Sequence, residues 1–547
     1  MKKNTFVQGA MIATVGVVIS KILGIVYVIP FYAIIGAQGG ALYGYAYIIY
    51  NIFLSLSSVG IPLAISRLTS EYDSLDQQDL KIRAFKIAKK IITILSASSF
   101  IILIVFAPNI AYFFIGDIKG GNTIEDVTFV IRIIAIAILI VPRLSVTKGY
   151  LQGHSFITVS TISQVLEQLV RVLFIIVGSY IAVRVLSLSI TVGVGVATFG
   201  AAIGGVVAYL YIKYNMKKYR EQITPTISKS ETKSNVKNKD IAIRILGYSS
   251  AFVFSSIALS SYDLIDLSTI LKTMVNGLAY TVEEAETVVS IFSTWGSKLN
   301  MIVASVAAGL LTSLVPTITN NFVTKKYDDV RSKINKSLQI LLFIAVPMTI
   351  GLSLLAKPVW TMFYQYDELC SSIFMVYIFM ALFSSVLATL NAIIQALSFQ
   401  KIMFVNISVG FILKVLLNVP FMYLFAYFGL HPAYGAIAAT LLGFSSSIIM
   451  NLKFLKRKLE VVYKETLTRT LKITASCLVM IAVVILLKVV IPFDVVHRSQ
   501  ALLAIILYGG VGAITYFVTT YKIGLIKDIF GATFINKVLA IFGKKCK

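Results

Sequence analysis

Runs of apolar residues, each long enough to cross a lipid bilayer, follow one another along almost the whole chain. A transmembrane helix needs roughly 20 consecutive residues that are mostly apolar. Fourteen such stretches lie at about 8–35, 42–68, 91–115, 125–147, 157–181, 186–212, 241–263, 286–315, 337–357, 370–395, 402–428, 432–452, 470–490 and 500–521. We therefore expect an all-α integral membrane protein with about 14 transmembrane helices.

The composition supports this class. Of the 547 residues 58% are hydrophobic and 13% are charged, whereas soluble domains carry ~25% charged residues. The formal net charge of +25 could by itself suggest a nucleic-acid partner. Whether the charge reflects such a partner or the membrane topology depends on where the basic residues lie in the chain.

Those positions follow the membrane topology. If the N-terminus is cytoplasmic, the loops on that side hold most of the 49 lysines and arginines. The opposite loops hold only Lys119, Arg184, Lys272, Lys357, Lys488 and Arg498. This positive-inside pattern assigns both termini to the cytoplasm. It also removes the need for a nucleic-acid partner and leaves anionic membrane lipids as contacts for the basic loops.

The chain contains an internal repeat. A shift of 243 residues aligns, without a gap, Gln152 with Gln395, Ser155-Phe156 with Ser398-Phe399, and Arg171 with Lys414. A second match, with a slightly longer shift, pairs Pro62 and Tyr72-Asp73 with Pro316 and Tyr327-Asp328. Six spans separate the corresponding elements, so the two halves should be parallel repeats with a substrate path between them.

The repeat predicts the domain organisation. We expect an N-terminal lobe at 1–213, a cytoplasmic linker at 214–240, a C-terminal lobe at 241–455, and two further spans with a basic tail at 456–547. The linker is basic and rich in Ser, Thr, Lys and Asn, a composition typical of mobile segments. The last two spans have no counterpart in the first half.

Several basic residues fall inside or at the ends of the predicted spans, where a charge costs from ~2.5 kcal/mol upward. They are Lys21, Arg67, Arg132, Arg143, Arg171, Arg244, Lys298 and Lys414. Arg67 lies near a cytoplasmic end, where it can reach water. Lys21 and Lys298 lie about half-way along their spans, with only serines as polar neighbours in sequence. They suit an anionic passenger in a wet cavity; pairing with a carboxylate such as Glu167 is the alternative.

The fifth span carries a polar stripe. Gln164, Glu167, Gln168 and Arg171 recur at i, i+3, i+4 and i+7, which places them on one face of a helix. Glu167 and Arg171 can pair within the helix, giving a neutral seam between helices. The same stripe could instead line a cavity and offer hydrogen bonds to sugar hydroxyls.

Motifs for chemistry are absent from the sequence. It has no GxxxxGK[ST], HExxH or GxSxG pattern and no membrane-deep group of carboxylates, which an ATP-driven pump, a hydrolase or a metal-dependent transferase would use. Its three cysteines lie far apart in sequence. We expect no cofactor, no metal and no enzymatic activity, and favour transport by alternating access.

Three segments carry a resemblance to a known family. They are 16–73, which begins GVVISKILGIVYVIP, SQVLEQLVRV at 163–172, and KLNMIVASVAAGLLTSLVP at 298–316. They resemble the polysaccharide-biosynthesis exporters of the multidrug/oligosaccharidyl-lipid/polysaccharide (MOP) superfamily, which includes the MATE transporters. Within it the chain is most similar to the SpoVB/YtgP branch, relatives of the MurJ-type lipid II flippases, over essentially its whole length.

This resemblance implies a fold, a location and a site. The expected fold has two six-helix lobes around a central cavity, plus two C-terminal helices whose groove holds a polyprenyl tail, in a bacterial cytoplasmic membrane. Lys21 and Lys298 match basic residues of the family's first and eighth spans, which implies pyrophosphate binding. With Arg171, Glu167, Gln164 and Arg67 they form the candidate substrate-binding set. The implied passenger is a lipid-linked oligosaccharide such as lipid II; whether an ion is coupled to its transport, and which one, stays unknown.

The sequence also departs from the lipid II flippase pattern. A second basic residue of the first span falls at Tyr27, and a basic pair of the second span falls near Phe53-Leu54. The cavity is therefore less cationic, which leaves open which lipid-linked glycan is carried.

The alternative function is a cation-coupled multidrug exporter of the same superfamily. A passenger that is itself cationic would call for buried carboxylates. Asp263 and Asp266 instead lie near the outer end of the seventh span, while the mid-span charges are lysines. The sign of the charge favours an anionic passenger.

The last two spans are almost entirely apolar and include Gly509, Gly510 and Gly512. Missing side chains at these positions could open a groove for the lipid tail. Glycines also let helices pack closely in lipid, so both interpretations stand at this point.

Overall fold

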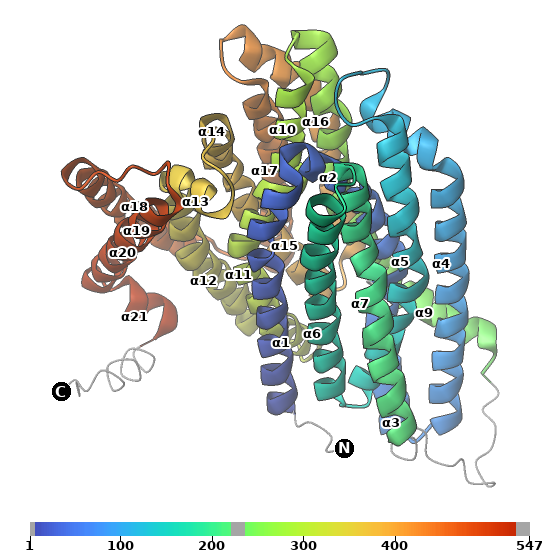
Figure 1. Ribbon diagram of the computed structural model, residues 1–547. Coiled ribbons are helices and arrows are strands. Elements are labelled where there is room, and N and C mark those ends of the chain that lie inside the picture. Colours follow the sequence, from blue (N-terminus) through green and yellow to red (C-terminus); the bar gives the residue numbers. More distant parts are fainter. Residues whose placement is uncertain (1–5, 59, 220–235, 532–547) are drawn as a thin grey trace. The chain divides into compact units, whose positions relative to one another are not determined.

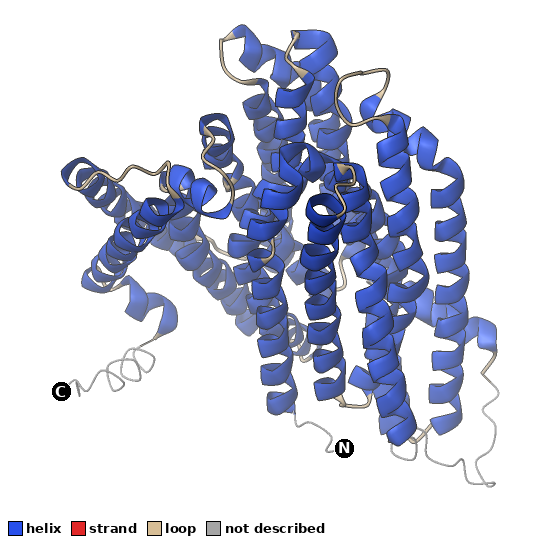
Figure 2. Cartoon of the chain, in the orientation of Figure 1, coloured by secondary structure: helices blue, strands red, loops and turns tan. Residues whose placement is uncertain are grey.

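The computed structural model describes residues 6–58, 60–219 and 236–531, and the regular elements in these ranges are all helical (Figures 1 and 2). Within this part of the chain, eleven helices are long and apolar enough to cross a membrane. The expected all-α membrane fold is confirmed, whereas the count of fourteen spans is not. Helices α1, α9 and α11 occupy three of the predicted spans but are not among the eleven.

The chain divides into two compact units, Met1–Lys298 and Leu299–Lys547, each described by itself below. The predicted lobe boundaries at 213 and 241 stay a prediction, and most of the linker between them lies outside the described residues.

The first unit is a bundle of long helices. Its elements are α1 (Phe6–Val26), α2 (Val28–Ser58), α3 (Gly60–Ser74), α4 (Gln78–Ile115), α5 (Ile124–Gly153), α6 (Ile157–Leu173) with π-helical turns η1 (Phe174–Gly178) and η2 (Ile181–Val185), α7 (Ile190–Lys218), α9 (Asn238–Lys272), η3 (Thr273–Gly277), α10 (Val282–Ser290) and η4 (Ile291–Trp295). Helix α11 (Gly296–Val323) begins at its end. The first predicted span is divided between α1 and α2, and α2 is kinked at Gly36, whose φ of 64° favours glycine.

The second unit contains the remaining helices. They are α12 (Tyr327–Leu354), α13 (Ala356–Phe363), α14 (Glu368–Tyr377), α15 (Phe379–Ala396), α16 (Gln400–Tyr427), α17 (Pro432–Leu459), α18 (Lys464–Val490), α19 (Arg498–Ala504), η5 (Ile505–Gly509), α20 (Gly510–Lys522) and α21 (Leu525–Phe530). The two last predicted spans correspond to α18 and to α19 through α20.

Close packing fixes α6 in the first unit. Helix α6 packs between α1 and α7, as Figure 1 also shows. A Cβ atom on Gly204 of α7 would lie 2.6 Å from the carbonyl oxygen of Glu167, so only glycine permits this approach. On the α1 side, a Cβ atom on Gly16 would lie 2.0 Å from a Thr161 methyl group. The polar stripe of α6 is therefore held at a fixed rotation between its two neighbours.

The 243-residue repeat is visible in the backbone. Ser155 and Ser398 both have positive φ, 63° and 64°. In each turn the serine N–H donates to the carbonyl of the aligned glutamine, Gln152 at 2.9 Å or Gln395 at 3.0 Å. The α5–α6 and α15–α16 connections thus share one turn geometry, as the sequence alignment predicts.

The second sequence match is wrong in register. Asp76 and Lys325 have φ of 54° and 57° and occupy the same place in two similar turns. In each turn the next residue donates its backbone N–H to the carbonyl oxygen of the residue five positions earlier. Gln77 donates to Tyr72 and Lys326 donates to Asn321, both at 2.8 Å. Tyr72 therefore precedes its turn whereas Tyr327 follows the other one. The two Tyr-Asp pairs therefore do not occupy equivalent places in the two turns.

Candidate substrate-binding site

A buried ion-pair cluster occupies the polar face of α6. Glu167 accepts from Arg171 at 2.8 Å, which confirms the predicted pair within the helix, and from Lys148 of α5 at 2.7 Å. The three side chains are only 14% to 18% exposed. Its position between two predicted spans suggests a cytoplasmic loop for Lys148. In the structure this lysine instead lies inside a helix packing interface. One carboxylate balances two cations, so the cluster keeps a net positive charge.

Tyrosines of α2 face this cluster. Tyr43, Tyr47 and Tyr50 recur at i, i+4 and i+7 on one face of the helix, and the rings of Tyr43 and Tyr47 stack with 4.2 Å between centroids. All three interact electrostatically with the Arg171 guanidinium. The Tyr50 hydroxyl and the Nε atom of Arg171 are buried without a hydrogen-bond partner among the described residues. This face therefore retains hydrogen-bonding capacity beside a positive charge.

Lys298 is connected to the same tyrosines. Its ammonium lies 5.6 Å from the ring centroid of Tyr27, a cation–π distance. The Tyr27 hydroxyl in turn interacts with that of Tyr43. Tyr27, Tyr43, Tyr47 and Tyr50, hereafter the tyrosine row, thus lead from Lys298 at one end to Arg171 at the other. The helical spacing of the three α2 tyrosines was the signal in the sequence that could have revealed this row.

Lys21 lies on α1, half-buried, and forms no hydrogen bond or ion pair with the described residues. Helix α1 packs on α6 near it, since a Cβ atom on Gly24 would lie 3.5 Å from Nε2 of Gln168. Glu167 is engaged by Lys148 and Arg171, so the structure does not show it pairing with Lys21 or Lys298. That the two lysines share one cavity stays a prediction.

The remaining candidates differ in their surroundings. Gln164 is half-buried on α6, one turn before Glu167 and Gln168. Arg67 is exposed on α3, and its guanidinium lies 4.4 Å from the ring centroid of Tyr248 on α9. The structure does not join Arg67 to the tyrosine row.

Besides Glu167, two acidic residues in the described part of the first unit are buried. Asp266 of α9 is 1% exposed and Glu286 of α10 is 2% exposed. The Glu286 carboxylate accepts from the backbone N–H of Asn122 at 2.6 Å. Asp266 lies near the end of α9 but is buried, so it bears on the alternative function. Among the described residues, no group of three or more His, Cys, Asp or Glu could hold a metal ion.

The second unit contains an apolar cavity of about 440 Å³. Its walls come from α11, α12, α13, α18, η5 and α20, and include Phe343, Met480 and Val484. Gly509 and Gly512 line it, whereas Gly510 does not. The groove interpretation therefore applies to two of the three glycines.

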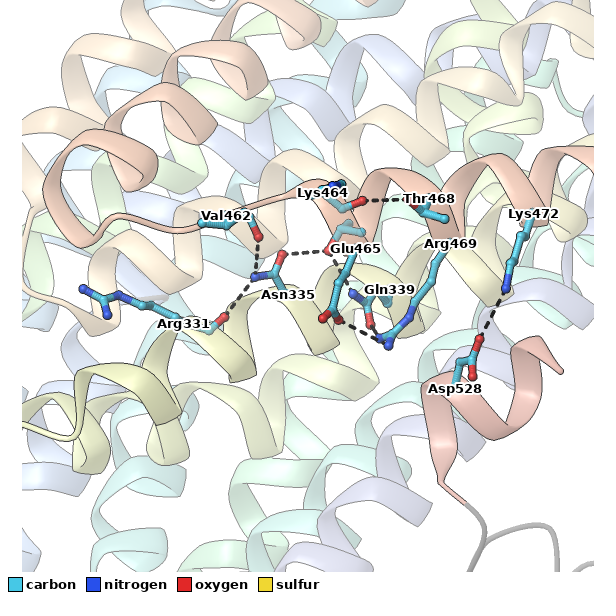
Figure 3. A network of polar contacts seen from close by, with 11 residues as sticks. Arg331, Asn335, Gln339, Val462, Lys464, Glu465, Thr468, Arg469, Lys472 and Asp528 are labelled. Atoms are coloured by element: carbon cyan, nitrogen blue, oxygen red, sulfur yellow. Dashed lines mark hydrogen bonds and ion pairs between the residues drawn. The ribbon is translucent and has the colours of Figure 1, made fainter.

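A network of polar contacts fastens α18, one wall of this cavity, to α12 (Figure 3). Arg469 donates to the side-chain oxygen of buried Gln339 and pairs with Glu465 at 3.3 Å. Gln339 donates to Thr466 at 2.9 Å, and Thr466 donates to Asn335 at 2.7 Å. Because both helices contribute bonded partners, the relative rotation of α12 and α18 is fixed at this end.

The fold defines a multi-pass membrane protein whose first unit presents cations and tyrosines together and whose second unit encloses an apolar cavity. The family described as polysaccharide biosynthesis protein matches residues 6–322, and the chain belongs to this family. It is 31% identical over 538 residues to the lipid II flippase MurJ of Bacillus subtilis (strain 168), covering 96% of this chain and 97% of that one. The resemblance found in the sequence is thereby confirmed.

Solved structures show the same fold. The lipid II flippase MurJ in an inward closed conformation matches with a TM-score of 0.68 and 16% identity, covering 95% of this chain and 100% of that one. An inward-facing multidrug resistance MATE family transporter of the MOP superfamily matches with a TM-score of 0.63 and 14% identity, covering 83% and 99%. The chain thus shares its fold with these two proteins, and the all-α membrane architecture is the one that the sequence predicts.

Proposed function

We propose that this protein is a flippase that moves a polyprenyl-pyrophosphate-linked glycan, lipid II or a related cell-wall precursor, across the bacterial cytoplasmic membrane by alternating access. The observation that carries the proposal is the 31% identity to a lipid II flippase along almost the full length of both chains. The charges and the apolar cavity supply independent physical support.

The passenger's pyrophosphate requires positive charge in a site shielded from bulk water. Lys298 and Arg171 stand at the two ends of the tyrosine row, and Lys21 lies half-buried on α1. An arginine presents a fork of N–H donors to phosphate oxygens, whereas a lysine acts as a point charge. Glu167 keeps the side chains of Arg171 and Lys148 oriented. It also limits the net positive charge of the cluster, so that a bound anion can be released again.

The glycan requires hydrogen bonds rather than charge. Tyrosine hydroxyls both donate and accept, and aromatic faces pack against the apolar faces of sugar rings. Gln164 and Gln168 add amide donors and acceptors on the same face of α6. This combination binds polyols without demanding one stereochemistry.

The polyprenyl tail requires an apolar path, because exposing it to water would cost ~0.8 kcal/mol per CH₂ group. The cavity of about 440 Å³ beside α18 and α20 has suitable walls. The protein acts on the passenger's position and not on its bonds, so it is a transporter and not an enzyme.

Rescue of a flippase-depleted bacterium tests the proposal. Expression of this chain in Bacillus subtilis depleted of its lipid II flippases should restore growth and lower the accumulated lipid II. It should also raise the fraction of lipid II accessible to a label added outside the cell. Normal membrane insertion without any of these changes, for lipid II and for other lipid-linked glycans, would refute it.

The alternative, a cation-coupled multidrug exporter, is favoured by buried Asp266 and by the MATE-type fold. It predicts efflux of cationic dyes from cells that express the chain, and loss of that efflux in Asp266→Asn. Under the flippase proposal, such cells retain dye like cells that lack the protein.

A further inference from the structure

Two lysines lie at the ends of neighbouring spans, on the side of the first unit that the charge pattern assigns to the cytoplasm. Lys89 of α4 is half-buried and precedes the predicted span 91–115 by two residues. Lys213 of α7 is exposed and directly follows the predicted span 186–212. Tyr214, the next residue, is 65% exposed, and tyrosines are enriched at membrane interfaces. Both lysines therefore lie at the depth of the lipid headgroups.

Helix packing brings the two lysines together. Helices α4 and α7 both pack on α5 (Figure 1). Ala88 and Ile212, each the residue before one of the lysines, belong to one buried apolar cluster. Lys89 lies close enough to Lys213 for the two charges to repel each other. The Lys89 ammonium also lies 4.5 Å from the ring centroid of Phe85, which orients it without neutralising its charge.

Other cations at this end of the unit have carboxylate partners. Three such pairs are Lys81 with Asp73 at 2.7 Å, Arg83 with Asp79 at 3.3 Å, and Arg244 with Glu71 at 2.9 Å. Lys89 and Lys213 differ, because neither forms a hydrogen bond or an ion pair with a residue that the structure describes. Two like charges held together at the edge of a low-dielectric medium are stabilised by an anion that binds both.

Apolar side chains continue from the lysines toward the membrane interior. Exposed apolar residues recur on one face of each helix: Ile94, Ile101 and Val105 on α4, and Val207 and Leu210 on α7. Because α4 runs away from the predicted cytoplasmic side and α7 runs toward it, all five lie deeper in the membrane than the lysines. The two helices thus present positive charge at headgroup depth and an apolar surface below it.

Basic pockets between transmembrane helices on the cytoplasmic side are suited to anionic lipid headgroups. We propose that Lys89 and Lys213 together bind the phosphate of an anionic phospholipid, whose acyl chains lie along α4 and α7. Phosphatidylglycerol has this chemistry. Phosphatidylcholine carries the same phosphate together with a cationic choline group, which the lysines repel. The inference does not depend on the flippase function, because this lipid is a bound component of the membrane and not a passenger.

Native mass spectrometry of the purified full chain in a neutral detergent, titrated with phosphatidylglycerol, measures the binding. Loss of one lysine should weaken binding about fivefold, and Lys89→Gln/Lys213→Gln about 25-fold. The matched control is Lys90→Gln/Lys218→Gln, which removes the same charge from exposed lysines of the same helices. These lysines lie about 100° and about 140° further around their helix axes, so the control should bind the lipid like wild type.

Thermal stability provides a second measurement. In lipid-free detergent, Lys89→Gln/Lys213→Gln should be at least as stable as wild type, because it removes a repulsion. Phosphatidylglycerol should raise the Tm of wild type saturably and that of the double variant much less. Lys213→Glu, which places a carboxylate beside Lys89, should have a higher Tm than wild type without lipid and respond little to it. This variant allows the same comparison should the double variant not fold.

Equal affinity of wild type and Lys89→Gln/Lys213→Gln for phosphatidylglycerol would overturn the proposal. So would equal affinity of wild type for phosphatidylcholine, since the charge of the lipid would then not be recognised. Inorganic phosphate that raises the Tm of wild type as much as phosphatidylglycerol does would show a free-anion site and overturn the lipid assignment. An equal loss of affinity in the control variant would show that only total charge matters.

Discussion

The Lys298 ammonium lies 5.6 Å from the centre of the Tyr27 ring. Tyr27 occupies the break between α1 and α2, where the resemblance to lipid II flippases would place a further basic residue. An aromatic ring at this position attracts the neighbouring lysine through its negative face and adds no charge. The first unit thus keeps an oriented cation at this place, with less positive charge than the family pattern implies.

The first prediction concerns the two mid-span lysines. Lys21→Ala or Lys298→Ala should abolish rescue of flippase-depleted cells while membrane expression stays normal, because each removes charge from the proposed pyrophosphate site. Arginine at either position should restore part of the activity. Lys86→Ala, which removes an exposed lysine of α4, is the matched control. Full activity of the Lys21→Ala/Lys298→Ala double variant would rule the role out.

A second prediction concerns Glu167. Glu167→Gln leaves Lys148 and Arg171 without their shared carboxylate, and breaking a buried ion pair costs about 3–5 kcal/mol. We expect a clear drop in Tm, partly recovered by adding Lys148→Met, which removes one of the two stranded charges. Asp79→Asn is the control, because Asp79 pairs with Arg83 at 3.3 Å at the same i, i+4 spacing but is more exposed, where pairs contribute about 0–1 kcal/mol. A similar loss in Asp79→Asn and Glu167→Gln would show that burial of the pair is unimportant.

A third prediction separates a lipid groove from simple helix packing. Gly509→Leu should fill part of the apolar cavity. Gly510→Leu should not, since a Cβ atom on Gly510 would have nothing within 4 Å and this residue does not line the cavity. Transport of long-chain polyprenyl substrates should fall more than that of short-chain analogues in Gly509→Leu alone. Equal losses for both chain lengths would indicate misfolding and remove the support for a groove.

The fourth prediction is the topology. Segments 69–90, 213–240, 317–336 and 453–469 should be cytoplasmic, together with both termini. Single cysteines replacing exposed Gln77, Lys218, Asp329 or Lys458 should resist an impermeant thiol reagent in intact cells. A cysteine at exposed Lys119 should react. The natural Cys370 and Cys477 are buried, so Cys546→Ser provides a suitable background. Labelling of the Lys218→Cys variant from outside would invert the assignment.

The sequence by itself determined the features that depend on near neighbours in the chain. Apolar runs predicted the helices, the i, i+4 spacing predicted the Glu167–Arg171 pair, and the repeat predicted matching turns at Ser155 and Ser398. In each case the interacting groups lie within one or two helical turns, where geometry follows from the 3.6-residue period.

Only the tertiary structure decided which residues meet across helices. It brought Lys148 to Glu167 and Lys298 to Tyr27, and it sealed Lys414 while leaving its counterpart Arg171 beside the tyrosines. It also separated Gly509 from Gly510 as cavity-lining and non-lining residues. These outcomes depend on the rotation and closeness of neighbouring helices, which are set by the packing of many side chains at once.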